Sequence, residues 1–463
     1  MITISFRPVI MRIILLLVLA AGFGALGWVA VRAAIGESIM IFIERSQRLS
    51  TEAKIEAADL SVKFAKDDPL VHWQRGGVYF NAANEESEEK RLDVALDELR
   101  RAALMNPEDY RMWLSFGRVL DRAGSIGDAR AALEKALQLA PNHFETHWTM
   151  GNHLLRAGDR DASFAQMRLA LSNRPSALPL IFDYAWSVFG GDGKAIAKAL
   201  DPPLRVKAQM IALIISRGKV EDGLSLWREM DSPTVKDVQK VVESLITVGK
   251  FAAAYDIWSS ANIPDRPSPD ANSLLANGGF EQKLAFNSTT PFFAWRITPA
   301  GIMRVTLDQK EPSEGNHSLR YSFDLEGNLP LTLATQTVPV KRNKKYCLSF
   351  FVKTEELESL STPLVEVFDA ADLNRAHAMT APVRTRNNKW TEYEIAIDTA
   401  AATEALTVRL QRPPCSEPPC PISGRVWFDG FKLNECAGAR KLEKRETHAD
   451  PMLSKSPAPN SNF

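Results

Sequence analysis

The sequence has no excess of charge of either sign, and this balance excludes whole classes of partner. Lys plus Arg and Asp plus Glu number 56 each among 463 residues, so the formal net charge is zero. A balanced chain lacks the basic surface that nucleic acid requires and has no acidic bias toward cationic partners. We therefore expect no nucleic-acid partner. The length allows two or three domains.

Cysteine is absent from the first 346 residues, and the four cysteines all lie in the last quarter of the chain. They are Cys347, Cys415, Cys420 and Cys436. No pair has the C-x-x-C spacing of a zinc or redox site. An even number within one region predicts disulfides among these four residues and an oxidising compartment. Four free thiols are the alternative, and the spacing does not decide the connectivity.

The N-terminal region, residues 1–45, contains a long stretch without charge. Residues 13–31 lie between Arg12 and Arg32, and nineteen residues of helix span roughly 28 Å, close to the thickness of a bilayer's hydrocarbon core. The apolar core of a cleavable signal peptide is shorter, about 7–15 residues. We therefore predict an uncleaved transmembrane helix over about 13–32. Arginines on both sides leave its orientation open.

An internal repeat follows the anchor. Pro107, Pro141 and Pro175 are each 34 residues apart, and so are Gly117 and Gly151. A fixed period of this length with helical periodicity predicts stacked helical hairpins. Two further hairpins align at a period of 31 residues, in which Gly218 matches Gly249 and Trp227 matches Trp258. We expect about five hairpins over residues 46–263.

The middle repeat resembles the tetratricopeptide family in its spacing and in its residue types. The third repeat departs from the pattern, because His147 stands at the first aromatic position. The resemblance implies an all-α solenoid that recruits a protein partner through its concave face. The matching residues of the middle repeat are Trp113, Phe116, Gly117, Leu120, Ala129, Leu133, Ala136 and Pro141.

His143 and His147 lie four residues apart and suggest a metal site at first sight. Zinc peptidases need H-E-x-x-H, whereas the glutamate here is two residues after the first histidine. No third ligand is evident, so we interpret the pair as a surface feature near a helix start.

After a Pro-rich linker at residues 264–273, the pattern changes to short alternating runs within 274–436. Turn residues separate the runs, which predicts an antiparallel sandwich or jelly roll. The predicted strands are 302–307, 318–323, 331–340, 345–352, 364–368, 390–397, 406–410 and 425–433.

Three local signatures occur in order along this region: Asn277-Gly278-Gly279-Phe280-Glu281 with Phe293-Ala294-Trp295, residues 314–319, and residues 426–433. Together they resemble the galactose-binding-like jelly rolls of carbohydrate-binding modules. Many members of that family carry a structural calcium. The resemblance implies a shell of carboxylates from Glu281 and Asp429 with carbonyls near Gly279 and Asn316. The alternative is that both acids are hydrogen-bonded turn residues without metal.

The same resemblance implies a glycan ligand, which flat aromatic faces would contact. We take Trp295 and Phe293 as the candidate ligand-binding residues, whereas Trp390 and Trp427 fit the core better. No pair of acids suited to glycoside hydrolysis stands out, and no segment of catalytic size remains. We therefore expect no enzymatic activity and no required cofactor.

The order of anchor, repeats and sandwich predicts a membrane-anchored, non-catalytic scaffold. The repeats would recruit a protein, and the sandwich would bind glycan or protein, in cell-surface polysaccharide assembly or export. The bulk would be periplasmic or extracytoplasmic, and the polar tail, residues 437–463, would be disordered. The alternatives are an accessory to a polysaccharide-active hydrolase and a structural adaptor without sugar binding.

Overall fold

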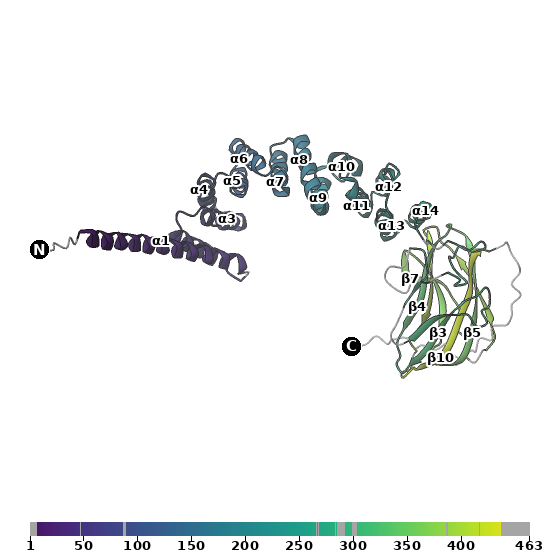
Figure 1. Ribbon diagram of the computed structural model, residues 1–463. Coiled ribbons are helices and arrows are strands. Elements are labelled where there is room, and N and C mark those ends of the chain that lie inside the picture. The colour runs from purple at the N-terminus through teal and green to yellow at the C-terminus, as the bar shows by residue number, and fades with distance from the viewer. Residues whose placement is uncertain are drawn as a thin grey trace, which may run out of the picture. The chain divides into compact units, whose positions relative to one another are not determined.

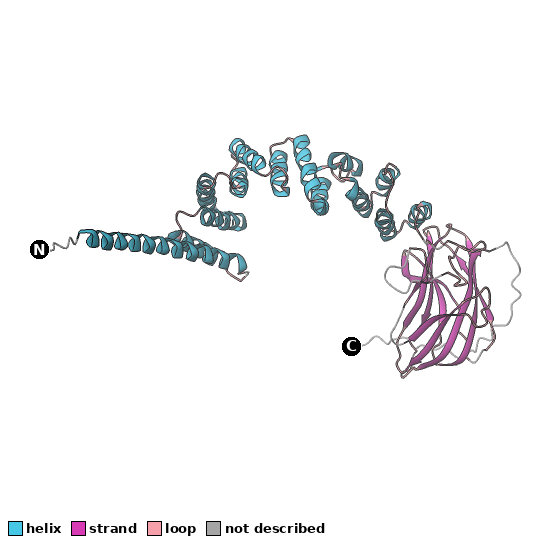
Figure 2. Cartoon of the chain, in the orientation of Figure 1, coloured by secondary structure: helices cyan, strands magenta, loops and turns pink. Residues whose placement is uncertain are grey.

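The computed structural model describes residues 7–46, 48–86, 89–264, 266, 268–282, 284, 292–298, 303–385, 388–415 and 417–436. The predicted disordered tail, residues 437–463, lies outside these residues. The chain divides into two compact units, Met1–Glu229 and Met230–Phe463. Helices come first and strands follow them, as Figure 2 shows by colour.

The first unit consists of helices that pack in consecutive pairs and are labelled along the chain in Figure 1. Three of these pairs, α3/α4, α5/α6 and α7/α8, correspond to the three predicted 34-residue repeats. The helices are α1 (Arg7–Arg45), α2 (Thr51–Phe64), α3 (Pro69–Glu86), α4 (Glu89–Met105), α5 (Tyr110–Arg122), α6 (Ile126–Leu139), α7 (Phe144–Arg156), α8 (Arg160–Asn173), α9 (Leu178–Val188), α10 (Gly193–Leu200), α11 (Leu204–Ser216) and α12 (Val220–Arg228), with a 3-10 turn at Pro175–Ala177.

Glycines end the first helix of several pairs. Gly124 and Gly158 have φ angles of 80° and 86°, a left-handed conformation that a glycine adopts without steric cost. The amide of Ser125 then donates to the carbonyl of Leu120, and the amide of Asp159 donates to that of Leu154. These bonds satisfy carbonyls that the helix end would leave unpaired.

Small residues let the paired helices approach closely, as the repeat pattern predicts. A Cβ atom at Gly117 would lie 2.6 Å from the Leu133 side chain, and one at Gly151 would lie 3.2 Å from the carbonyl oxygen of Ser163. Ala129 and Ala136 are fully buried. The repeats therefore consist of closely packed helix pairs.

Helix α1 extends well beyond the predicted span and takes part in the helical array. By length and composition it is long and apolar enough to cross a membrane. Past the span, Met40 and Ile43 are buried and pack near Ala58 of α2. The array thus begins with a pair made by the end of α1 and by α2. The described residues contain six further pairs, where the sequence predicted about five.

We predict that Gly36→Val separates α1 from α2. A Cβ atom at this position would lie 2.7 Å from the Cβ of Ala65 and 2.9 Å from the carbonyl oxygen of Ser61, so the helices would have to move apart. Overpacking of this kind costs about 1–3 kcal/mol. Thermal unfolding of the full chain in detergent measures the loss. Gly22→Val is the matched control, because a Cβ atom there meets nothing within 4 Å; an equal shift in both variants would contradict the prediction.

The second unit opens with helices α13 (Val235–Thr247) and α14 (Phe251–Ser260), and a β-sandwich follows them. Its two antiparallel sheets have the strand orders β1-β4-β9-β6-β7 and β2-β3-β10-β5-β8. The strands are β1 (Arg296–Ile297), β2 (Met303–Asp308), β3 (Ser318–Leu325), β4 (Leu331–Pro339), β5 (Lys345–Glu358), β6 (Leu364–Asp369), β7 (Asp372–Met379), β8 (Thr391–Asp398), β9 (Ala405–Arg412) and β10 (Ile422–Glu435).

All eight predicted strands are present, and two strands were missed. β1 has two residues, too few for an alternating pattern to show, and β7 is mostly exposed. The two sheets share one core. Aromatic rings fill it, and Phe350 and Phe431 stack with their centroids 4.7 Å apart.

Candidate functional site

A groove of about 660 Å³ lies in the first unit, where the array begins. Helices α1, α2, α3 and α5 supply most of its wall. The first two of the 34-residue repeats therefore meet there. Its lining residues include Met40, Ile43, Glu44, Lys54, Trp73, Gln74, Phe80, Asn81, Asn84, Glu85, Ser115 and Arg118.

The groove combines aromatic surface with amide groups and charges of both signs. The indole of Trp73 donates to Ser115 Oγ at 2.8 Å, and this bond joins α3 to α5. The guanidinium of Arg118 lies 5.7 Å from the centroid of the Phe80 ring. Gln74 Oε1 is buried without a hydrogen-bond partner. An unpaired buried acceptor is costly, so a bound group that donates an N–H would be stabilised there.

A buried ionic network supports helix α3 behind this groove. His72 is fully buried and lies 2.5 Å from Glu98 of α4, and Arg75 pairs with both Glu98 and Asp59 of α2. Burial acts to raise the pKa of Glu98, but the hydrogen bond from His72 and the charge of Arg75 outweigh it and hold that pKa low. Sequence reasoning missed these residues. Their signal was the spacing of His72, Arg75 and Tyr79 along one face of α3, and the hydroxyl of Tyr79 also donates to Asp59.

His147 is buried at 6% exposure, so the interpretation of the histidine pair as a surface feature is wrong for this residue. Its Nε2 lies 2.6 Å from the carbonyl oxygen of Pro141, and in the preceding repeat the indole of Trp113 donates to the carbonyl of Pro107 at 2.9 Å. The two residues therefore fill the same position. His143 instead lies 3.1 Å from the hydroxyl of Tyr110. Among the described residues, no three His, Cys, Asp or Glu gather where they could hold a metal ion.

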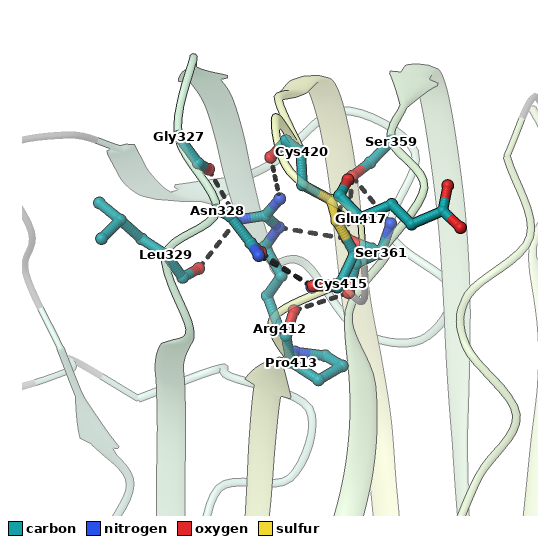
Figure 3. Close-up of a disulfide and its surroundings, with 10 residues drawn as sticks. All are labelled: Gly327, Asn328, Leu329, Ser359, Ser361, Arg412, Pro413, Cys415, Glu417 and Cys420. Atoms are coloured by element: carbon teal, nitrogen blue, oxygen red, sulfur yellow. Dashed lines mark hydrogen bonds between the residues drawn. A yellow bond between two sulfur atoms is a disulfide. The ribbon is translucent and has the colours of Figure 1, made fainter.

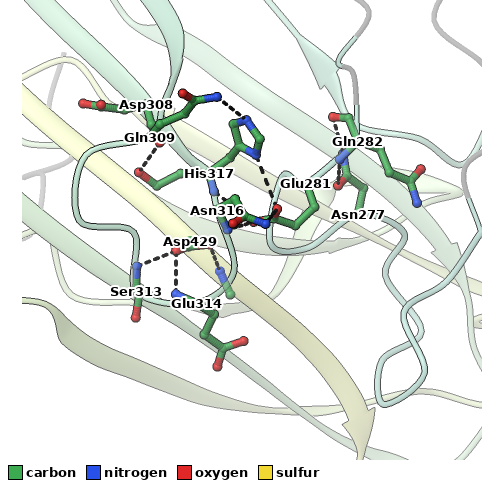
Figure 4. A network of polar contacts seen from close by, with 12 residues as sticks. Asn277, Glu281, Gln282, Asp308, Gln309, Ser313, Glu314, Asn316, His317 and Asp429 are labelled. Carbon is green, nitrogen blue, oxygen red and sulfur yellow. Dashed lines mark hydrogen bonds and ion pairs between the residues drawn. The ribbon is translucent and has the colours of Figure 1, made fainter.

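The structure brings three residues of the predicted calcium shell, Glu281, Asn316 and Asp429, to one loop (Figure 4). Asp429 of β10 is fully buried and accepts from the amides of Ser313 at 2.8 Å and Glu314 at 3.0 Å. Glu281 accepts from the amides of Asn316 at 2.7 Å and His317 at 2.9 Å. The two carboxylates thus hold one loop, residues 313–317, from both sides.

These contacts are those of hydrogen-bonded turn residues. The partners of Asp429 and the main-chain partners of Glu281 are N–H donors, which a cation shell would have to displace. A Cβ atom at Gly279 would lie 3.9 Å from Asp429 Oδ1, so Gly279 is adjacent. The residues in this arrangement fit the metal-free alternative better than an oxygen shell. The calcium itself stays a prediction.

Burial raises the pKa of Asp429 to about 6, although three main-chain amides oppose the rise. The pKa of Glu281 is low instead, because its hydrogen bonds from Asn316 and His317 outweigh the effect of burial. Glu281 is half-exposed at 37% of its side chain, whereas Asp429 is fully buried. Asp429 is therefore the acid of this pair that folding penalises when it is charged.

We predict that Asp429 lowers the free energy of unfolding by an amount that depends on pH. Its folded pKa of about 6 lies above its ordinary 3.8, so the unfolded chain ionises first as the pH rises. The group costs nothing below about pH 4, and between about pH 4 and 6 it removes roughly 3 kcal/mol from the free energy of unfolding. Denaturant unfolding of wild type and Asp429→Asn at pH 4, 5, 6 and 7 measures the difference.

The free-energy difference between the two proteins should change by that amount across the window. A constant difference would contradict the prediction. Calcium in the same series tests the metal. Because a bound cation requires the charged carboxylate, it would stabilise wild type more at pH 7 than at pH 5.

The candidate sugar-binding residues occupy two different environments. Trp295 is 3% exposed and packs against Phe280 and Phe431, with ring centroids 5.7 and 5.1 Å away. Its ring faces are thus unavailable to a sugar, and its assignment is corrected to a core residue. The alternating pattern could not place Trp295, because this residue precedes a strand of only two residues, β1. Phe293 is half-buried and meets Tyr255 of α14 edge-on, with centroids 5.2 Å apart. Sugar contact by Phe293 stays a prediction.

Trp390 and Trp427, the tryptophans that the sequence assigned to the core, both lie close to the ammonium group of Lys353. Lys353 Nζ lies 5.1 Å from the ring centroid of Trp427 and 5.6 Å from that of Trp390. Trp427 is 5% exposed and donates to Asp308, while Trp390 is half-buried and donates to the carbonyl of Glu311. Trp390 therefore offers more ring surface than Trp295 or Trp427.

The four cysteines form two disulfides. Cys347 of β5 pairs with Cys436, just after β10, and Cys415 pairs with Cys420 in the Pro-rich loop between β9 and β10. Beside the second disulfide lies Arg412, which is fully buried (Figure 3). Its guanidinium donates to the main-chain carbonyls of Ser361, Gly327, Leu329 and Cys420. Burial lowers the pKa of Arg412.

We predict that Arg412→Met destabilises the sandwich by about 2–4 kcal/mol, because it leaves several buried carbonyls without a donor. Urea unfolding of the full chain measures the loss. Arg409→Met on the same strand is the matched control. Arg409 pairs with Glu366 and is 26% exposed, so its loss should cost less than about 1 kcal/mol. Equal losses in the two variants would show that the carbonyl cluster is not the cause.

Comparison with known proteins gives partial similarities. No protein-family model matches the chain. The chain is 29% identical over 97 residues to the human Protein O-mannosyl-transferase TMTC1, a match that covers 21% of this chain and 11% of that protein. It is 28% identical over 88 residues to the mouse protein of the same name, covering 19% and 9%. The chain thus matches about a tenth of the length of these relatives.

This similarity corrects one prediction. Both relatives are named as sugar-transferring enzymes, which contradicts the expectation that the chain is not an enzyme. That expectation depended on the absence of a carboxylate pair suited to glycoside hydrolysis. Such a pair serves hydrolysis, so its absence does not bear on glycosyl transfer.

Among solved structures, the chain is similar to a carbohydrate-binding module titled "CBM4 structure and function", with 15% identity, 35% of this chain and 99% of that chain covered, and a TM-score of 0.26. It is also similar to a MamA double mutant, with 17% identity, coverage of 44% and 98%, and a TM-score of 0.31. A third is the O-GlcNAc transferase of Thermobaculum terrenum, with 20% identity, coverage of 30% and 26%, and a TM-score of 0.27. At these TM-scores we base no argument on the likenesses.

Proposed function

We propose that the chain is a membrane-anchored binding protein whose helical groove holds a segment of a protein partner. The groove of about 660 Å³ at the start of the array carries this proposal. The galactose-binding-like sandwich contacts a glycan, and the setting is cell-surface polysaccharide assembly or export. The bulk of the chain lies outside the cytoplasm, in agreement with its two disulfides.

The chemistry of the groove suits a polypeptide. Asn81 and Asn84 are exposed, and amide side chains both donate to and accept from a peptide main chain. Trp73 and Phe80 supply apolar surface for side chains of the partner. Glu85 and Arg118 place opposite charges in one groove, which favours a segment with charges of both signs.

Both relatives are named as enzymes that transfer mannose to protein, so their names refer to a protein and a sugar together. This agrees with a chain that engages a protein through its helices and a glycan through its sandwich. Glycosyl transfer is accordingly an activity to measure directly in the purified full chain. Trp390 is the aromatic ring we assign to glycan contact, since Trp295 and Trp427 are almost fully buried.

Photo-crosslinking from within the groove tests the proposal. A crosslinking residue at Asn81 in the full-length membrane protein should trap a defined partner, and Arg118→Ala should reduce trapping about tenfold, a loss of roughly 1.4 kcal/mol. A crosslinker at Asn142, which is exposed and outside the groove, is the positional control. Arg130→Ala matches Arg118→Ala, because Arg130 is exposed and pairs with Glu134.

Equal trapping from Asn81 and Asn142, or no effect of Arg118→Ala, would contradict a partner site in the groove. The trapped complex is also examined for bound glycan and for incorporation of labelled mannose. Glycan retention that Trp390→Ala abolishes supports a glycan-contacting sandwich. Absence of any retained glycan assigns the sandwich to protein docking.

A further inference from the structure

The part of α1 that follows the predicted span has two different faces. One face carries Gly36, Met40 and Ile43, which are buried near α2. The other face is mostly apolar and exposed, with Ile35 40% exposed and Phe42 58% exposed, while Ile39 on it is half-buried and also packs against the cluster near α2. It forms a shallow groove of about 450 Å³, lined by Val31, Ala34, Ile35, Ser38, Ile39 and Phe42. We call these six residues the outer face of α1.

We propose that the outer face of α1 lies against lipid, so that the first helix pair of the array is seated in the membrane interface. This inference rests on the proposed membrane anchoring of the chain. The outer face continues the apolar surface of the span without a break in the helix, because α1 runs from Arg7 to Arg45 (Figure 1). Val31 belongs to both the span and the outer face and is 53% exposed.

The length of this apolar surface fits more than the hydrocarbon core of a bilayer. From Ile13 to Phe42 the helix rises roughly 44 Å, whereas the hydrocarbon core is about 30 Å thick and the whole bilayer about 40–45 Å. A helix with so long an apolar face tilts or places its end in the interfacial region. Residues 33–42 would occupy that region with only their outer face toward lipid.

The charges around the outer face are arranged as this position requires. Glu37 is exposed but does not line the outer face. Glu44 lines the 660 Å³ groove at the start of the array instead. At the boundary, Arg32 donates to the carbonyl of Lys63 at 2.8 Å, which brings two basic residues to the same level. Basic side chains at the headgroups of anionic lipids are favourable, whereas acidic ones are not.

Spin labelling of the full chain in vesicles of phosphatidylcholine and phosphatidylglycerol tests this position. Single cysteines at Ile35 and Phe42 report the outer face, Glu37 and Glu44 report the flanking positions, and Leu19 reports the span. The native cysteines are paired in disulfides, so they do not take the label under non-reducing conditions. We expect the ratio of oxygen to nickel-chelate accessibility at 35 and 42 to exceed that at 37 and 44 and to stay below that at 19, because the outer face is placed in the interfacial region and Leu19 in the hydrocarbon core.

Each other outcome overturns the inference in a distinguishable way. If 35 and 42 are as open to the nickel chelate as 37 and 44 while 19 is protected, the anchor holds but the outer face lies in water. If 19 is also open, the proposed span fails, and the inference fails with it. If labels at 35 and 42 exclude both reagents and broaden each other until unlabelled protein dilutes them, a second copy covers the face. Unfolding curves equal to wild type confirm that the labelled proteins are folded.

Discussion

One helix has to suit two surroundings, and the arrangement of the first unit depends on how it does so. Over the predicted span of α1, a Cβ atom at Gly22, Gly24 or Gly27 would meet no other protein atom within 4 Å. Past the span, a Cβ at Gly36 would collide with α2. Because the helix is continuous, the direction of the predicted span and the direction of the first helix pair are fixed together. The groove that contains Met40 and Ile43 is therefore held close to the predicted span.

The repeats that follow are alike in a hydrogen bond as well as in shape. In two successive repeats a ring nitrogen bonds to the carbonyl of the proline that follows the preceding helix. Trp113 makes this bond to Pro107, and His147 makes it to Pro141. Each proline lies two residues beyond the end of its helix, where no further helical turn supplies a donor to its carbonyl. Histidine keeps the donor that tryptophan supplies, so the third repeat departs from the family pattern in residue type while it keeps the interaction. The second ring nitrogen of His147 then reaches Gln166 of the paired helix.

The sequence predicted what depends on local spacing and missed what depends on pairing between distant segments. The 34-residue period and the alternating runs located the helix pairs and eight strands, because periodicity reports which face of an element is buried. It did not reveal that α1 pairs with α2, since an apolar helix looks alike beside lipid or protein. Periodicity also did not reveal the contact between His72 and Glu98, because these two residues lie 26 positions apart in the sequence. Trp295 was misassigned because its place in the core is set by Phe431, on the last strand.

The last strand is the element that completes the sandwich. β10 lies in the middle of its sheet, between β3 and β5, although it comes last in the chain. It is held at three levels: Cys420 just before it accepts from Arg412, Asp429 within it binds the loop 313–317, and Cys436 just after it joins β5. The contacts of Asp429 and Cys436 join residues at least 89 positions apart, and such contacts form only after long stretches of chain are ordered. The buried charge of Asp429 is therefore tolerated where it secures the strand on which both halves of that sheet depend.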